Sequence, residues 1–170
     1  TFQKQDVSKA NLVGTSLFGD GAAAAIIGYE GTGPEILGFF SRMIPDSSDV
    51  MGWDVVDTGL KVRFSREIPA IVRQYLPGFL EEACSTWGIK KETLQHFVVH
   101  PGGAKVLQAY QASLKISLDS LKSAYAVLSQ YGNMSSASLL FVLENFLEIT
   151  PCAGAWGVML ALGPGFSAEQ

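Results

Sequence analysis

Residues 155–162 are the part of the sequence that most restricts its fold. They read Ala-Trp-Gly-Val-Met-Leu-Ala-Leu, carry no charge, and are closed by Gly163, Pro164 and Gly165. A strand of this composition has no polar face to turn to water, so both of its faces must be covered. The run therefore predicts a sheet inside a core, and 170 residues that are 48% hydrophobic are enough for one such domain.

Helical periodicity is clearest from Ile68 to Trp87. Apolar residues recur there at spacings of three and four, which predicts a helix with one face in the core. Ser65 is expected to cap this helix and Gly88 to end it. Pro77 lies inside the pattern and is expected to kink or split the helix, because proline removes a backbone donor.

Strands and helices alternate along the rest of the chain. Residues 97–99 are a short β-branched and aromatic run, and helical patterns follow at 104–113 and 118–129. Residues 135–147 are apolar on nearly every side, which is typical of a helix buried in a large core. This alternation indicates an α/β fold with a mixed sheet, and no second domain boundary is visible.

The first third of the chain is predicted to be extended. Residues 20–28 read as a tight turn that feeds a strand of small residues. Residues 35–40 and 60–64 read as extended stretches on either side of a turn at 45–49, so a hairpin-like excursion is expected.

Charge and composition argue against several partners. With 12 basic and 16 acidic residues the net charge is -4, which does not favour nucleic acid. No apolar run reaches the roughly 20 residues of a membrane helix and no leader pattern opens the chain, so we expect no membrane. The two cysteines are too far apart for a metal or redox pair and too few for a disulfide framework, which favours a reducing cytoplasm. Thr1 opens the chain in place of methionine, which suggests a piece of a longer protein.

Three corners follow hydrophobic elements and could carry chemistry: His100 to Gly103, Gly132 to Ser136, and Gly163 to Gly165. Ends of strands and starts of helices are where α/β folds build sites. Histidine can donate or accept a proton near neutral pH, and asparagine offers an uncharged NH₂ donor, so together they could cradle an oxyanion. Each also has a structural interpretation, with Asn133 as a helix cap and the glycines as turn formers.

Four segments resemble the chalcone and stilbene synthase family of type III polyketide synthases, in its bacterial form. They are His-Pro-Gly-Gly at 100–103, Tyr-Gly-Asn-Met-Ser-Ser-Ala-Ser at 131–138, Leu-Phe-Gly-Asp-Gly-Ala-Ala-Ala at 17–24, and Gly-Pro-Gly at 163–165. The resemblance implies the C-terminal half of a thiolase-like αβαβα layered fold with a mixed β-sheet. Residues 1–170 would then be one C-terminal domain, without the half that bears the nucleophile.

The resemblance also implies a reaction. A cysteine takes an acyl group from coenzyme A, malonyl-CoA is decarboxylated to an enolate, and the two are condensed repeatedly before cyclisation. His100 and Asn133 match the catalytic positions and would donate to the enolate oxygen. A charged His100 would also hold the cysteine as thiolate. Neither Cys84, on the apolar helix face, nor Cys152, in a loop, fits the nucleophile.

Further residues match substrate-binding positions of the family. Phe2 resembles a gatekeeper between the coenzyme A tunnel and the cavity, Gly52 and Ser135 match cavity-lining positions, and Gly163, Pro164 and Gly165 match a loop beneath the cyclisation pocket. Lys105, just past the His100 turn, could meet a coenzyme A phosphate. The alternative for the glycines is simple backbone geometry.

One position departs from the plant pattern. Val62 stands where plant members have an aromatic residue, and the smaller side chain could open the cavity. With the bacterial-looking segment at 51–55, this suggests a fatty acyl starter and an alkylpyrone or alkylresorcinol product. The expected partners are acyl-CoA, malonyl-CoA, the missing N-terminal half and a second copy in a homodimer. We expect no cofactor beyond the coenzyme A thioesters and no metal.

Two other functions remain open. A ketoacyl synthase III of fatty acid synthesis shares the fold and the catalytic Cys, His and Asn residues. Pro-Gly-Gly after His100 and Met-Ser-Ser after Asn133 argue against this alternative. A non-catalytic acyl-CoA-binding or scaffolding domain is favoured by the missing nucleophile. Catalysis by the 170-residue chain alone is not expected.

Overall fold

A mixed four-stranded sheet lies at the centre of the computed structural model, which describes residues 3–31, 33–149 and 154–170. Strand β4 (Leu94–Val99) pairs in parallel with β5 (Trp156–Gly163), and Val99 stands opposite Leu160. Strand β6 (Ser167–Glu169) pairs antiparallel with both β5 and β1 (Ser41–Met43), giving the order β1-β6-β5-β4. The predicted mixed sheet and the apolar strand at its centre are confirmed.

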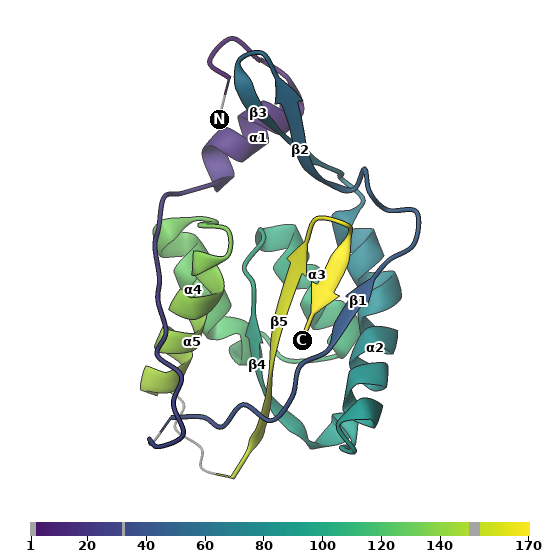
Figure 1. Cartoon of the computed structure of the whole chain (residues 1–170), viewed down its shortest axis with the longest axis vertical. Coiled ribbons are helices and arrows are strands. Elements are labelled where there is room, and N and C mark those ends of the chain that lie inside the picture. The colour runs from purple at the N-terminus through teal and green to yellow at the C-terminus, as the bar shows by residue number, and fades with distance from the viewer. Residues whose placement is uncertain (1–2, 32, 150–153) are drawn as a thin grey trace.

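Helices lie on both sides of this sheet, as Figure 1 shows, with α2 on one side and the α4–α5 pair on the other. The helices are α1 (Lys9–Leu17), α2 (Ile68–Thr86), α3 (Ala104–Leu114), α4 (Lys122–Tyr131) and α5 (Ala137–Ile149), with 3₁₀ turns at Lys91–Thr93 and Asp119–Leu121. The core between α2, α3 and the sheet is tightly buried, and Leu80, Val99, Leu107 and Tyr110 are at most 1% exposed. In the described part of the chain no helix is long and apolar enough to cross a membrane.

Helix α2 runs through Pro77 without a break, so the helix is not split there. Val72, Leu76 and Leu80 on its inner face are almost fully buried. Their burial stabilises the helix by roughly 1.5–3 kcal/mol per side chain, which offsets the lost backbone hydrogen bond. Ser65 is not the N-cap: Glu67 is, and the Ser65 hydroxyl instead accepts from the Glu67 N–H at 3.1 Å.

A hairpin of β2 (Met51–Val56) and β3 (Gly59–Phe64) projects from the body of the molecule with α1 packed on it (Figure 1). The prediction of an excursion is confirmed, but its turn is wrong. Val56 pairs with Gly59, so residues 57 and 58 form the turn, and Gly59 takes the positive φ of 117° that glycine allows. Residues 35–40 form no strand.

Residues 20–28 do not form the predicted strand either. The segment is extended and exposed, and Ile26 and Tyr29 are fully open to solvent. In the described residues no strand lies beside it to pair its backbone groups, and without such pairing a run of small apolar residues is not a strand.

Candidate functional site

The backbone of Asn133, in the turn between α4 and α5, is held on both sides by the segment that follows α1. The Asn133 N–H donates to the Leu17 carbonyl at 2.9 Å, and the Asn133 carbonyl accepts from the Gly19 N–H at 3.0 Å. The two bonds form an isolated parallel bridge between Phe18 and Asn133. Both peptide planes that flank Asn133 are therefore fixed by residues more than a hundred positions earlier.

The side chain of Asn133 is also fixed, and only 5% of it is exposed. Its Oδ1 accepts from the Ser135 N–H at 2.8 Å, and its Nδ2 donates to the Gly102 carbonyl at 3.4 Å. The first bond sets the orientation of the amide, because only the oxygen can accept. The NH₂ group therefore points to the turn that follows His100, and its one bond to the described residues is long.

Glycine is required in this turn for steric reasons. Gly132 has a φ of 72°, and a Cβ atom there would lie 2.7 Å from the Leu17 carbonyl oxygen. A Cβ on Gly19 would meet the Tyr131 carbonyl oxygen, and one on Gly21 would meet the Met134 sulfur. The close approach of the two segments depends on Gly19 and Gly132, where the new Cβ would meet backbone, whereas the flexible Met134 side chain can move away from one on Gly21.

His100 stands at the C-terminal end of β4, as predicted. Its N–H donates to the Leu160 carbonyl at 2.8 Å, so the backbone continues the parallel pairing for one more residue. The His100 carbonyl accepts from the Gly102 N–H at 2.9 Å, which closes a tight turn across Pro101. A Cβ on Gly102 would lie 3.6 Å from the His100 ring, so the imidazole and the carbonyl that Asn133 contacts lie together.

Burial lowers the pKa of His100 to about 4, because the surrounding protein disfavours the charged ring. The imidazole of this chain is therefore neutral at pH 7 and still donates one ring N–H. The expected imidazolium requires an adjacent negative charge, such as a thiolate, to raise this pKa.

Neither cysteine of the chain is seen at this site. Cys84 is 2% exposed on α2, and burial raises the pKa of its thiol, so Cys84 is a core residue. Cys152 lies outside the described residues.

The hairpin connects to the site through two aromatic rings. Val62 is buried on β3, and Phe64 shares its face because strand side chains alternate. The Phe64 ring packs edge-on against Phe18 at 6.5 Å, and Phe18 bridges Asn133. Gly52 lies on the partner strand opposite Arg63, and Ser135 lies beside Asn133 in a left-handed conformation with a φ of 56°.

The remaining predicted residues lie on other elements or outside the described residues. Gly163, the last residue of β5, lies three residues, or about 10 Å of strand, beyond Leu160, and Pro164 and Gly165 follow it in the turn to β6. Lys105 is exposed in the first turn of α3. Phe2 lies outside the described residues.

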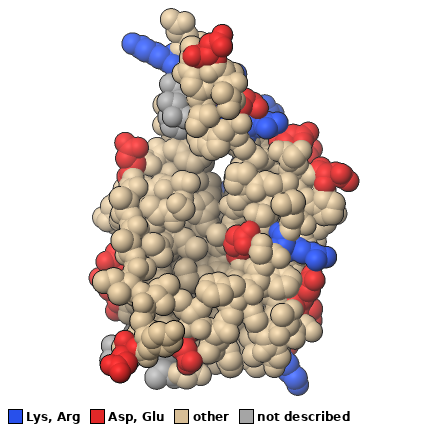
Figure 2. Space-filling view, viewed as in Figure 1, with Lys and Arg blue, Asp and Glu red and all other residues tan. Residues whose placement is uncertain are grey.

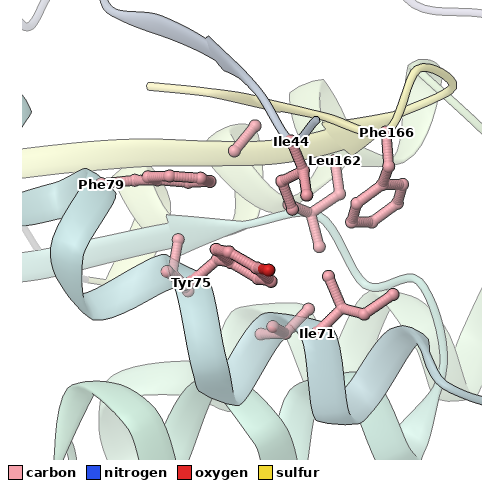
Figure 3. Close-up of a pocket in the computed structure, with 9 residues that line it drawn as sticks. Ile44, Ile71, Tyr75, Phe79, Leu162 and Phe166 are labelled. Atoms are coloured by element: carbon pink, nitrogen blue, oxygen red, sulfur yellow. The ribbon is translucent and has the colours of Figure 1, made fainter. Parts of the chain in front are cut away.

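Two hollows lie away from His100. The apolar cavity in Figure 3, between α2 and the strands β5 and β6, has about 10 Å³ and is too small for an acyl group. An open groove of about 590 Å³ runs between Ala22 to Ala25 and one face of α5. Figure 2 shows that the face of the molecule in this view is largely uncharged and hollowed along its middle.

Sequence reasoning missed the contact of residues 17–19 with Asn133 and the buried hydroxyl of Ser138, which accepts from the Met134 N–H at 2.7 Å. The glycine spacing at 19 and 21 is the signal that could have indicated close packing at the first of these. A serine beside the apolar run 139–143 in the first turn of a helix is the signal for the second. Among the described residues no three histidine, cysteine, aspartate or glutamate side chains form a metal-binding group.

Comparison with known proteins identifies relatives over the whole chain. Residues 36–170 match the family model of the chalcone and stilbene synthases, C-terminal domain. The chain is 42% identical to a chalcone synthase-type protein of Bacillus subtilis (strain 168) over 99% of its own length and 49% of the relative. It is 39% identical to 1,3,6,8-tetrahydroxynaphthalene synthase of Streptomyces peucetius subsp. caesius, over 98% of the chain and 46% of the relative. The chain thus spans about half the length of these relatives.

Solved structures agree. The 1,3,6,8-tetrahydroxynaphthalene synthase of Streptomyces coelicolor A3(2), a bacterial type III polyketide synthase, matches with a TM-score of 0.92 and 32% identity, over 99% of this chain and 49% of that one. The C-terminal type III polyketide synthase domain of Steely1 from Dictyostelium matches with a TM-score of 0.84 and 28% identity, over 99% and 48%. The fold is thus the C-terminal half of the thiolase-like fold, and the chain belongs to the chalcone and stilbene synthase family of type III polyketide synthases, of which it contains the C-terminal domain.

Proposed function

We propose that this chain is the C-terminal half of a polyketide synthase that condenses an acyl-CoA starter with malonyl-CoA by decarboxylative Claisen condensation. His100 and Asn133 are its catalytic residues. The observation that carries the proposal is the fixed amide of Asn133, whose Nδ2 points to the Gly102 carbonyl beside the His100 ring.

The chemistry needs donors at one developing oxygen anion. In malonyl-CoA the bond to the carboxylate carbon breaks, CO₂ leaves, and the electron pair moves onto the thioester oxygen to form an enolate. The enolate carbon then attacks the acyl thioester on the enzyme and releases the thiolate. A preorganised donor at such an oxygen is typically worth about 3 kcal/mol, and His100 and Asn133 supply two.

The nucleophilic cysteine is proposed to come from outside this chain, because Cys84 is the one cysteine among the described residues and it does not fit the role. Cys84 is buried in the core of α2. A thiolate placed beside the neutral His100 ring would raise the pKa of His100, because an opposite charge favours the protonated form. The ion pair of the mechanism is therefore a property of the two halves together.

Apolar surface on this chain supports packing against the missing half. Ile26, Ile27 and Tyr29 are exposed in the segment that forms no strand, and the groove beside α5 is mostly apolar. Exposed apolar patches of this kind mark interaction sites. The partners proposed are the N-terminal half, a second copy in a homodimer, and the two coenzyme A thioesters, with the Lys105 ammonium near a phosphate.

Val62 is the residue proposed to select the starter. Its face of the hairpin leads through Phe64 and Phe18 to Asn133. A valine here takes up less volume than the aromatic residue of plant members, which is the basis for proposing that it favours a longer starter. We propose a fatty acyl starter and an alkylpyrone product. The likeness to two synthases named for 1,3,6,8-tetrahydroxynaphthalene favours that naphthalene as a second candidate product.

The test uses the full-length synthase that contains this chain, beside its His100→Gln and Asn133→Ala variants. Each variant is expected to lose at least about 100-fold in malonyl-CoA decarboxylation, since one oxyanion donor is typically worth that much. Wild-type rates in the variants would place the site elsewhere. Starters from hexanoyl-CoA to stearoyl-CoA and an aromatic acyl-CoA are compared by mass spectrometry of products, and a preference for the aromatic starter would contradict the fatty acyl proposal.

A non-catalytic acyl-CoA-binding domain is the other candidate, because the described residues hold no accessible cysteine. It predicts that acyl-CoA binds to this chain alone and that the full-length protein forms no polyketide. Calorimetric titration of the 170-residue chain with stearoyl-CoA, next to the activity assay, separates the two.

A further inference from the structure

We infer that Ser138 is a positioning residue for Asn133, through its hydrogen bond to the peptide plane that joins Asn133 to Met134. The inference rests on the proposed function, because it assigns a role in the same reaction. Ser138 is the second residue of α5, its side chain is fully buried, and its Oγ accepts from the Met134 N–H at 2.7 Å.

This peptide plane is held at both ends. The Asn133 carbonyl accepts from the Gly19 N–H at 3.0 Å, and the N–H of the same peptide donates to Ser138. Without the hydroxyl, the buried Met134 N–H has no acceptor, and an unsatisfied buried donor drives the peptide to rotate toward another one. Rotation of this plane changes the ψ angle of Asn133 and moves its carbonyl away from the Gly19 N–H, so the residue that carries the amide loses one of the bonds that hold it.

The other bonds that orient Asn133 come from the backbone. Leu17 and Gly19 hold its main chain, and the Ser135 N–H holds its Oδ1. The Ser138 hydroxyl is the side-chain group that bonds a peptide plane next to Asn133, so a single substitution removes it without changing the course of the chain. Ser138 is fully buried, so it acts only through Asn133.

The experiment measures malonyl-CoA decarboxylation by the full-length synthase with Ser138→Ala, Ser138→Cys and Ser138→Thr. Ser138→Ala is expected to lower kcat about tenfold and to leave KM within about twofold, since the donor is misplaced in the transition state. Ser138→Cys, a weaker acceptor of similar shape, should fall between, and Ser138→Thr, which keeps the hydroxyl, should stay within about threefold of wild type. Ser123→Ala, a buried serine of α4, is the control and should not change kcat.

To distinguish a positioning role from a purely structural one, kcat for decarboxylation is also measured for Ser138→Ala in the Asn133→Ala background. A residue that acts through Asn133 should lower kcat no further there, whereas a general loss of stability lowers it in both backgrounds. A kcat of Ser138→Ala near wild type, or an equal loss in both backgrounds, overturns the inference. If Ser138→Ala does not fold, a wild-type kcat for Ser138→Cys overturns it instead.

The two proposals fail in different ways. Wild-type decarboxylation by Asn133→Ala would contradict the proposed function and this role together. Loss of decarboxylation by Asn133→Ala with no effect of the Ser138 series would contradict this role alone.

Discussion

At the scale of single residues, the candidate site consists of a fixed amide and a neutral imidazole. Asn133 has its main chain, its Oδ1 and one Nδ2 hydrogen engaged, and no second acceptor for Nδ2 lies among the described residues, so its other hydrogen can donate to a ligand. His100 has lost most of its contact with water, and its pKa is lowered to about 4. Both groups can therefore donate to an anion without being charged themselves.

The lowered pKa of His100 predicts a pH dependence of stability. Between pH 6.5 and about 4 the unfolded chain binds a proton at this histidine and the folded chain does not, so the free energy of unfolding falls as the pH is lowered through this window. The full effect is up to about 3 kcal/mol. Urea unfolding of this chain at pH 7 and pH 4.5 should show a smaller loss for His100→Gln than for wild type. An equal loss in both would show that His100 does not titrate as described.

At the scale of elements, the site depends on the segment after α1 lying directly on the turn between α4 and α5. Glycine allows this approach at Gly19 and Gly132, and Gly132 also carries a positive φ. The same segment brings Phe18 against Phe64 of the hairpin. Helix α1, the hairpin and the Asn133 turn are therefore in contact with one another, although they lie far apart in the sequence.

Gly132→Ala tests this contact. The new Cβ would lie 2.7 Å from the Leu17 carbonyl oxygen at a φ of 72°, so we expect a loss of about 2 kcal/mol in the free energy of unfolding and weaker decarboxylation in the full-length synthase. Gly78→Ala in α2 is the matched control, because nothing lies within 4 Å of its Cβ. Since alanine is the better helix former, that variant should gain up to about 1 kcal/mol. Equal effects at the two positions would contradict the close packing.

At the scale of the whole molecule, the chain corresponds to about half the length of its relatives, and one of its faces is apolar and open. The segment at 20–28 has no strand beside it in the described residues, and the groove between Ala22 to Ala25 and α5 is open. Apolar side chains in this position stabilise the protein only when something covers them.

The Ile26→Lys substitution tests whether residues 20–28 are covered in the full-length synthase. In the 170-residue chain the side chain is fully exposed, so its replacement should leave the unfolding midpoint unchanged and reduce self-association in sedimentation velocity. In the full-length synthase the same change should lower the free energy of unfolding by about 2 kcal/mol, because it places a charge in a buried contact. Leu118→Lys, at an exposed position before α4, is the control and should be neutral in both. No destabilisation by Ile26→Lys in the full-length protein would show that this segment stays uncovered.

Local sequence pattern was sufficient for the elements whose signal repeats within a few residues. The all-apolar run at 155–162, the short strand ending at Val99 and the periodic helix from Ile68 were predicted because burial on one or both faces shows directly in the order of side chains. His100 and Asn133 were placed at turns for the same reason, and their family resemblance singled them out. The catalytic roles of these two residues stay predictions until the variants are measured.

The tertiary structure alone decided the features that depend on distant partners. The apolar small residues at 20–28 read as a strand, but a strand also needs a neighbour, and no local pattern records one. The hairpin turn was misplaced because strand register, and not composition, sets it at residues 57 and 58. The direction of the Asn133 amide, the contact of Leu17 with it and the burial that makes His100 neutral all arise from chain segments that meet only in the folded molecule, because hydrogen bonds and desolvation act through space.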